Sequence, residues 1–173
     1  NLPMEIIARR GIKVARAVAA NANGVAELAL ALMLAGFRHI PLNDRGIRAT
    51  AWPRPMGKEI AGATIGVVGL GAIGSLAAQK FLQLGASVVG YDPFAAPEAL
   101  SAQPGFTMVT ALERLVTQSD GLTLHCPQPA DNKPLLDAGL LAAARPGVVI
   151  VNTARAGLVD ADAMLAALDQ GKV

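Results

Sequence analysis

The stretch Gly69-Leu70-Gly71-Ala72-Ile73-Gly74 decides the fold of this 173-residue chain. Its G-x-G-x-x-G spacing lies between an apolar run at 64–68, typical of a buried strand, and an apolar pattern at 72–84, typical of a helix. In such a turn the first glycine permits the tight bend, the second lets backbone approach a pyrophosphate, and the third lets the helix pack against the strand. The start of the helix, at Ala72, Ile73 and Gly74, presents free N–H groups to phosphates. The stretch therefore predicts a dinucleotide site.

Strands and helices alternate regularly after this turn. Gly85 closes the first helix, and we expect further strands at 87–91, 106–109, 121–125 and 148–151. Helices are expected at 111–117, 137–144 and 160–170, the first of them opened by a capping box between Thr110 and Glu113. This alternation predicts an α/β fold, a doubly wound parallel sheet of the Rossmann type with helices on both faces.

The chain before the turn is less regular. A helix over 4–10 leads into a short strand at 11–14, and a second helix runs from Asn23, its expected N-cap, to about Phe37. Apolar residues cover nearly every side of the second helix, so we expect it either in the centre of the domain or in a subunit interface. The segment 41–62 contains three prolines and is expected to be an irregular crossing.

Composition and charge limit the possible partners. The chain is 53% hydrophobic but only 3% aromatic, so its core is expected to consist mainly of Ala, Val, Leu and Ile. The net charge of +2 is spread without runs of like charge, and no nucleic-acid partner is expected. The strongest apolar run, 28–37, is about half as long as the roughly 20 residues of a membrane span. We expect a cytoplasmic protein with one thiol, Cys126, no membrane partner and no metal site.

Asp92 points to the identity of the dinucleotide. It closes the strand 87–91 and follows Gly74 by 18 residues. At this place a carboxylate accepts hydrogen bonds from the adenosine ribose hydroxyls and repels a 2′-phosphate. No Arg or Lys follows at 93–96 to bind such a phosphate. The sequence therefore favours NAD over NADP.

Several separated stretches resemble the D-isomer-specific 2-hydroxyacid dehydrogenase family, which includes phosphoglycerate dehydrogenase and hydroxypyruvate reductase. They are Val-Ala-Glu-Leu-Ala-Leu at 25–30, the glycine turn with Tyr-Asp-Pro at 91–93, His-Cys-Pro at 125–127, and Asn-Thr-Ala-Arg at 152–155 with Leu-Val-Asp at 158–160. Their order and spacing match the family. Two positions depart from it: Ala156 replaces a glycine and Gly24 replaces a serine or threonine. Ala156 therefore needs a backbone conformation that tolerates a Cβ.

The resemblance implies a two-domain enzyme that transfers a hydride between NAD(H) and C2 of a small 2-hydroxy acid. Residues 1–20 would be the end of the substrate-binding domain with its hinge, and 21–173 the NAD-binding domain, truncated before its last strands. A catalytic histidine paired with a glutamate would lie beyond Val173, so the fragment alone is expected to bind NAD without turnover. The helix that starts near Val25 resembles the dimer-forming helix of the family, which implies a homodimer.

The resemblance also assigns site residues. Arg155 would bind the substrate carboxylate and polarise the keto group, and a guanidinium at the carboxyl end of a parallel strand is by itself a suitable bidentate carboxylate partner. The other residues expected to border the cofactor are His125, Cys126, Pro127, Thr153 and Ala154. For His125 a structural role is favoured over catalysis, and no base is apparent that would make Cys126 a nucleophile.

Two other interpretations stay open. The chain could belong to an NAD-sensing interaction module, as in the transcriptional corepressors that share this fold and these motifs, which would read the cofactor without turnover. It could also belong to another NAD-binding protein, such as a homocysteine-nucleoside hydrolase, in which the motif around Arg155 should differ.

Overall fold

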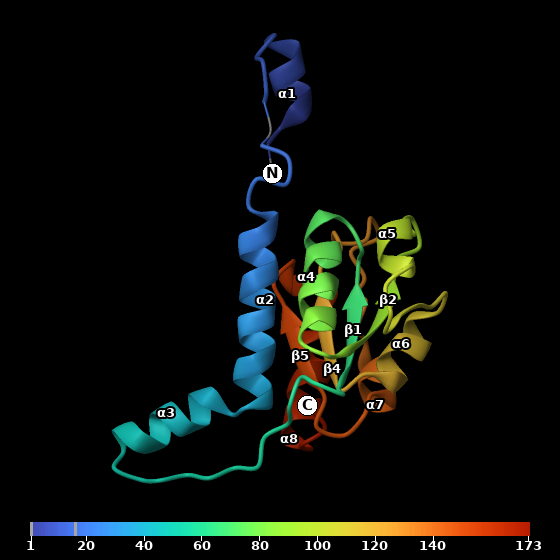
Figure 1. Cartoon of the computed structure of the whole chain (residues 1–173). Coiled ribbons are helices and arrows are strands. Elements are labelled where there is room, and N and C mark those ends of the chain that lie inside the picture. The colour runs from blue at the N-terminus through green and yellow to red at the C-terminus, as the bar shows by residue number, and fades with distance from the viewer. Residues whose placement is uncertain (1, 16) are drawn as a thin grey trace.

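Five parallel strands lie side by side at the centre of the computed structural model, which describes residues 2–15 and 17–173 (Figure 1). The strand order is β3-β2-β1-β4-β5. The strands are β1 (Thr64–Val68), β2 (Ser87–Tyr91), β3 (Phe106–Met108), β4 (Gly121–Leu124) and β5 (Val149–Asn152). All four predicted strands after the glycine turn are therefore present, with ends within one residue of the predicted ones.

Helices cover both faces of this sheet. On one face lie α2 (Ala22–Phe37) and α4 (Ala72–Gln83), which contact each other as well as β5 and β1. On the other face α6 (Leu112–Gln118) contacts β1 and β2, and α7 (Ala138–Ala143) packs between α6 and α8 (Ala161–Asp169). The short α5 (Glu98–Ser101) packs against β3. The prediction of a doubly wound parallel sheet is thus confirmed.

Successive residues of the strands supply two separate cores because side chains alternate between the faces of a sheet. In β1, Ile65 and Val67 pack with α2 and α4, whereas Val68 packs with Leu122 of β4 and Leu115 of α6. All five of these side chains are almost completely buried. A sheet covered on both faces explains why its strands are continuous apolar runs.

Local capping chemistry fixes some of the helix ends. The Oδ1 atoms of Asp137 and Asp160 accept hydrogen bonds from the N–H groups of Leu140 and Ala163, at 2.9 and 3.0 Å, at the starts of α7 and α8. Gly85 follows α4 with φ of +82°. The predicted capping box at Thr110 was wrong: α6 begins after Ala111, which is extended and offers no side-chain acceptor. The helix starts one residue late, which moves Thr110 out of the N-cap position.

The predictions before the glycine turn needed more correction. The helix α1 (Met4–Arg9) is present, but 11–14 forms no strand because it lies away from the sheet and has no strand beside it (Figure 1). The N-cap of α2 is Asn21, not Asn23. Asn23 lies inside the first turn, where its Nδ2 donates to Glu27 Oε1 at 2.7 Å.

The segment 41–62 was wrongly expected to be irregular throughout. The helix α3 (Ile40–Arg48) occupies its first part and projects away from the sheet (Figure 1). Pro41 is its second residue, where the missing N–H costs no intrahelical hydrogen bond and the fixed φ suits a helix. The remainder, 49–62, contains no helix or strand, as expected.

The helix α2 buries only one side. Ala26, Ala29 and Met33 are fully buried against α4 and β5, whereas Leu28 and Leu32 are 51% and 44% exposed. It is therefore not central in this domain. Within the described ranges no single helix is long and apolar enough to cross a membrane; α2 and α3 reach that length only together, as a pair bent by 64°.

Candidate cofactor-binding site

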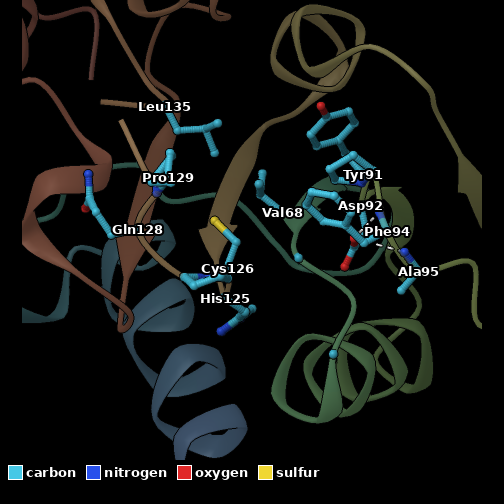
Figure 2. A pocket seen from close by; sticks show the side chains of 15 residues that line it. Val68, Tyr91, Asp92, Phe94, Ala95, His125, Cys126, Gln128, Pro129 and Leu135 are labelled. Atoms are coloured by element: carbon cyan, nitrogen blue, oxygen red, sulfur yellow. Dashed lines mark hydrogen bonds between the residues drawn. The ribbon is translucent and has the colours of Figure 1, made fainter. Parts of the chain in front are cut away.

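A pocket of about 570 Å³ opens at the carboxyl ends of β1, β2 and β4. The strand order reverses between β1 and β4, since β1 continues to β2 on one side while β4 lies on the other. In open α/β sheets such a reversal leaves a crevice at the carboxyl ends of the strands. Figure 2 shows Tyr91, Asp92 and Phe94 on one side of the pocket, with Cys126 and Pro129 on the other.

The three glycines of the turn have different structural requirements. Gly69 has φ of +87°, and a Cβ there would lie 2.8 Å from the backbone nitrogen of Cys126. A Cβ on Gly74 would collide with the carbonyl oxygen of Gly69. Gly71, in contrast, has an ordinary φ of −66°, and a Cβ would meet no atom within 4 Å. The fold therefore requires Gly69 and Gly74, whereas Gly71 keeps a space open at the end of α4.

The first turn of α4 leaves backbone donors free at this space. Among the residues that the structure describes, none accepts a hydrogen bond from the N–H groups of Ala72, Ile73 or Gly74, and no side chain caps the helix. Three free donors and the positive end of a helix dipole suit an anion, and phosphate is the usual one. These residues fit the pyrophosphate of a dinucleotide.

The carboxylate of Asp92 is fixed beside this turn by three backbone donors. Its Oδ2 accepts from the N–H of Leu70 at 2.8 Å. Its Oδ1 accepts from the N–H groups of Phe94 and Ala95 at 2.8 and 3.1 Å (Figure 2). A carboxylate oxygen can accept a second bond, so a ribose hydroxyl can still bind here. Asp92 thus holds the glycine turn in place and also lines the pocket.

His125 lines the pocket at the end of β4. Its Nε2 lies 2.9 Å from Oγ1 of Thr123, a fully buried hydroxyl on the same strand. Burial lowers the pKa of His125 from 6.5 to about 4. A neutral, hydrogen-bonded imidazole at pH 7 supports the structural interpretation of this residue.

We expect His125 to make the stability of the domain depend on pH. Between about pH 6.5 and 4 the unfolded chain binds a proton at this residue while the folded chain does not, so stability falls as the pH falls through this range. The loss should approach about 3 kcal/mol in wild type, measured by urea unfolding at several pH values. His125→Gln should show a clearly smaller loss. Equal pH dependence in wild type and His125→Gln would contradict a buried neutral imidazole.

Cys126 also lines the pocket but is a poor nucleophile. Burial raises the pKa of its thiol; a hydrogen bond to the backbone opposes this, and the negative charge of Asp92 adds to it. Since the thiolate is the reactive form, the thiol serves here as an apolar part of the pocket wall.

The turn after β5 carries Arg155. Asn152 closes this turn with both ends of its side chain: Oδ1 accepts from the Ala154 N–H at 3.0 Å, and Nδ2 donates to the Arg155 carbonyl at 2.8 Å. The guanidinium is exposed, and its Nη1 donates to the carbonyl of Ala154 at 2.9 Å. Ala156 begins the short 3-10 helix η1 (Ala156–Leu158) without a positive φ, so the missing glycine causes no strain.

The predicted site residues thus fall into three groups. Gly69, Gly71, Asp92, His125, Cys126 and Pro127 line one pocket. Ala72, Ile73 and Gly74 form the helix end beside it. Thr153, Ala154 and Arg155 follow the neighbouring strand β5 and do not line the pocket, and the Oγ1 of Thr153 is buried without a hydrogen-bond partner. Sequence reasoning missed Phe94, Gln128, Pro129 and Leu135, of which the first three lie within five residues after the end of a strand.

A comparison with protein families agrees with this geometry. Residues 30–173 match the family model described as "D-isomer specific 2-hydroxyacid dehydrogenase, NAD binding domain". The D-3-phosphoglycerate dehydrogenase of Mycobacterium bovis is 42% identical over 175 aligned positions, which cover the whole chain and 33% of that protein. The hydroxypyruvate reductase of Thermotoga maritima is 34% identical, with the whole chain and 56% of that protein covered. The chain thus spans about a third of the first of these relatives.

Solved structures share the fold. The D-2-hydroxyisocaproate dehydrogenase structure superposes with a TM-score of 0.91 at 32% identity and covers 99% of this chain and 52% of the other. The apo-structure of D-lactate dehydrogenase from Escherichia coli gives a TM-score of 0.89 at 31% identity, with 100% and 54% covered. The cofactor is NAD, in agreement with the phosphate-binding turn and with Asp92. The chain therefore belongs to the D-isomer-specific 2-hydroxyacid dehydrogenase family, of which it contains the NAD-binding domain.

Proposed function

We propose that the protein carrying this chain is an NAD-dependent oxidoreductase that transfers a hydride between NAD(H) and C2 of a 2-hydroxy or 2-oxo acid. The observation that carries the proposal is the open, donor-lined space at Gly71 beside the fixed carboxylate of Asp92. Relatives named for phosphoglycerate, lactate and hydroxyisocaproate act on substrates that share a 2-hydroxy acid group. We therefore propose that group as the substrate class.

We propose that Arg155 binds the substrate carboxylate and polarises the keto oxygen. It follows β5, the strand next to β4, so it stands at the same edge of the sheet as the pocket. Among the described residues its guanidinium pairs with no carboxylate, and it can turn toward an anion without breaking an ion pair. A planar guanidinium suits a carboxylate because it can donate two parallel hydrogen bonds.

Neither of the two histidines of the chain suits the transfer of the substrate proton. His125 hydrogen bonds to Thr123 and is neutral with a pKa near 4, and His39 bonds to the Met56 carbonyl next to α3. We assign this step to a histidine paired with a glutamate that this chain does not supply. What its own residues do is bind the dinucleotide and hold the substrate carboxylate.

We propose two further features of the whole protein. Leu28 and Leu32 form part of an apolar side of α2 that this domain leaves uncovered, and a second copy of the chain would cover it in a homodimer. Residues 1–20 would belong to a substrate-binding domain, since α1 buries none of its residues and leaves Met4 and Ile6 exposed.

Steady-state kinetics of the full-length protein test the proposed function. A panel of 2-oxo acids is offered with NADH, and cofactor oxidation is followed by absorbance. We expect turnover with at least one 2-oxo acid, and binding of NADH at least about tenfold tighter than that of NADPH. Tight NADH binding without turnover on any acid would instead favour the NAD-sensing interpretation. Equal affinity for NADPH would contradict the role of Asp92.

A further inference from the structure

Gln128 makes a contact that the cofactor site does not require. It lies in the loop 125–130, of which every residue lines the pocket, but its carboxamide points away from Asp92 and Cys126 (Figure 2). The Nε2 atom donates to the carbonyl oxygen of Gly157 at 3.0 Å, and at 3.5 Å it also approaches the carbonyl of Lys133. The side chain therefore links the loop after β4 to the turn after β5.

Gly157 leaves space for this side chain because it has no Cβ. A Cβ at this position would lie 2.7 Å from Oε1 and 3.1 Å from Cδ of Gln128, with Gln128 atoms as its nearest neighbours. The φ of Gly157 is not positive, so its backbone conformation suits any residue. A methyl group at this position would thus force the carboxamide of Gln128 to move, whereas the fold of η1 does not require a glycine.

The linked turn is the one that carries Arg155. Asn152 fixes the turn from the β5 side, with hydrogen bonds to Ala154 and to Arg155 itself. Gln128 fixes it from the opposite side, two residues beyond Arg155. An exposed arginine on a turn held at both ends moves less than one held at a single end, and a catalytic group must be placed within about 0.5 Å of its productive position.

We propose that Gln128 is a positioning residue for Arg155, which ties the placement of the guanidinium to the loop that lines the cofactor pocket. The inference rests on the proposed function, in which Arg155 binds the substrate carboxylate. Loss of the link should weaken binding of the 2-oxo acid more than binding of NADH, because the carboxamide is hydrogen bonded to the turn that carries Arg155 and not to Asp92 or the start of α4.

Kinetics of Gln128→Leu in the full-length protein provide the first test. Leucine keeps much of the side-chain volume and removes the donor, so we expect the KM for the 2-oxo acid to rise about fivefold to tenfold, as for the loss of one hydrogen bond. The Kd for NADH should stay within about twofold. Gln103→Leu, the same change at an exposed position, should leave both unchanged. The proposal would be overturned if Gln128→Leu changed the KM for the 2-oxo acid and the Kd for NADH equally, or if it changed neither of them.

Gly157→Ala provides a reciprocal test, because the new methyl group would displace the carboxamide. The single variant should raise the KM as Gln128→Leu does. In a Gln128→Ala background the methyl group has nothing to displace, so the double variant should match Gln128→Ala alone. Additive effects would show that Gly157 acts independently of Gln128, and would count against the link.

Hydrogen exchange separates this proposal from the proposed function. The N–H of Leu158 donates to the Arg155 carbonyl at 3.1 Å, so its exchange rate reports how firmly the turn is held. In the 173-residue chain we expect Gln128→Leu to accelerate exchange at Leu158 several-fold while the β1 amides stay unchanged. A wild-type protein that reduces no 2-oxo acid would overturn the proposed function, whereas unchanged exchange at Leu158 would overturn the role of Gln128.

Discussion

Replacing Gly71 by alanine should weaken NADH binding severely while leaving the domain folded. The backbone of Gly71 has φ of −66° and its surroundings are empty within 4 Å, so a methyl group there meets no protein atom. The same methyl group would occupy the space in which a pyrophosphate approaches the N–H groups of α4. We expect the Kd for NADH to rise by about 100-fold or more.

Gly74→Ala, in contrast to Gly71→Ala, should destabilise the fold itself. Its methyl group collides with the carbonyl oxygen of Gly69, a backbone atom of the glycine turn. This atom cannot move freely because α4 packs tightly on β1. We expect a loss of about 3 kcal/mol or more of unfolding free energy. Urea unfolding and NADH fluorescence titration on both variants make the comparison. Unimpaired NADH binding by Gly71→Ala would mean that no phosphate approaches this glycine.

The parts of the site that follow from local chemistry could be predicted from sequence. A G-x-G-x-x-G turn between an apolar strand and a helix has few alternatives, and the position of Asp92 at the end of the next strand follows from the same βαβ unit. The strands of the sheet could also be predicted, because a strand buried on both faces appears in the sequence as an unbroken apolar run. What the sequence did not indicate is that Leu70 donates to Asp92, which ties the turn and the acid together.

The sequence-based predictions were wrong or incomplete where the structure depends on contacts between distant residues, or where a helix begins one residue away from the expected position. Pro41 suggested a loop, but a proline in a first turn is compatible with the helix α3. Thr110 has a side chain that can cap a helix, but the N-cap residue of α6 is Ala111, one position later. The hydrogen bond from Gln128 to Gly157 joins residues 29 apart in sequence, and no local sequence pattern predicts such a contact.

Arg155 differs from Asp92 in how few groups of the domain contact its charged end. The carboxylate of Asp92 accepts three backbone hydrogen bonds, whereas in the part of the chain that the structure describes the guanidinium of Arg155 donates to the carbonyl of Ala154 alone and pairs with no carboxylate. It is exposed, and its removal leaves no buried partner without a bond. Folding thus gains little from Arg155, while the edge of the sheet on which it stands is the edge of the cofactor pocket.

We therefore expect Arg155→Lys to lower kcat/KM for the 2-oxo acid by about 100-fold in the full-length protein, because an ammonium cannot donate the paired hydrogen bonds of a guanidinium. The Kd for NADH should stay within about twofold, and unfolding free energy within about 0.5 kcal/mol, since the side chain is exposed. Arg114→Lys on the exposed surface of α6 is the matched control and should change neither quantity. A lysine variant with full kcat/KM would mean that the substrate carboxylate binds to another group, because a carboxylate held by paired donors discriminates strongly between the two cations.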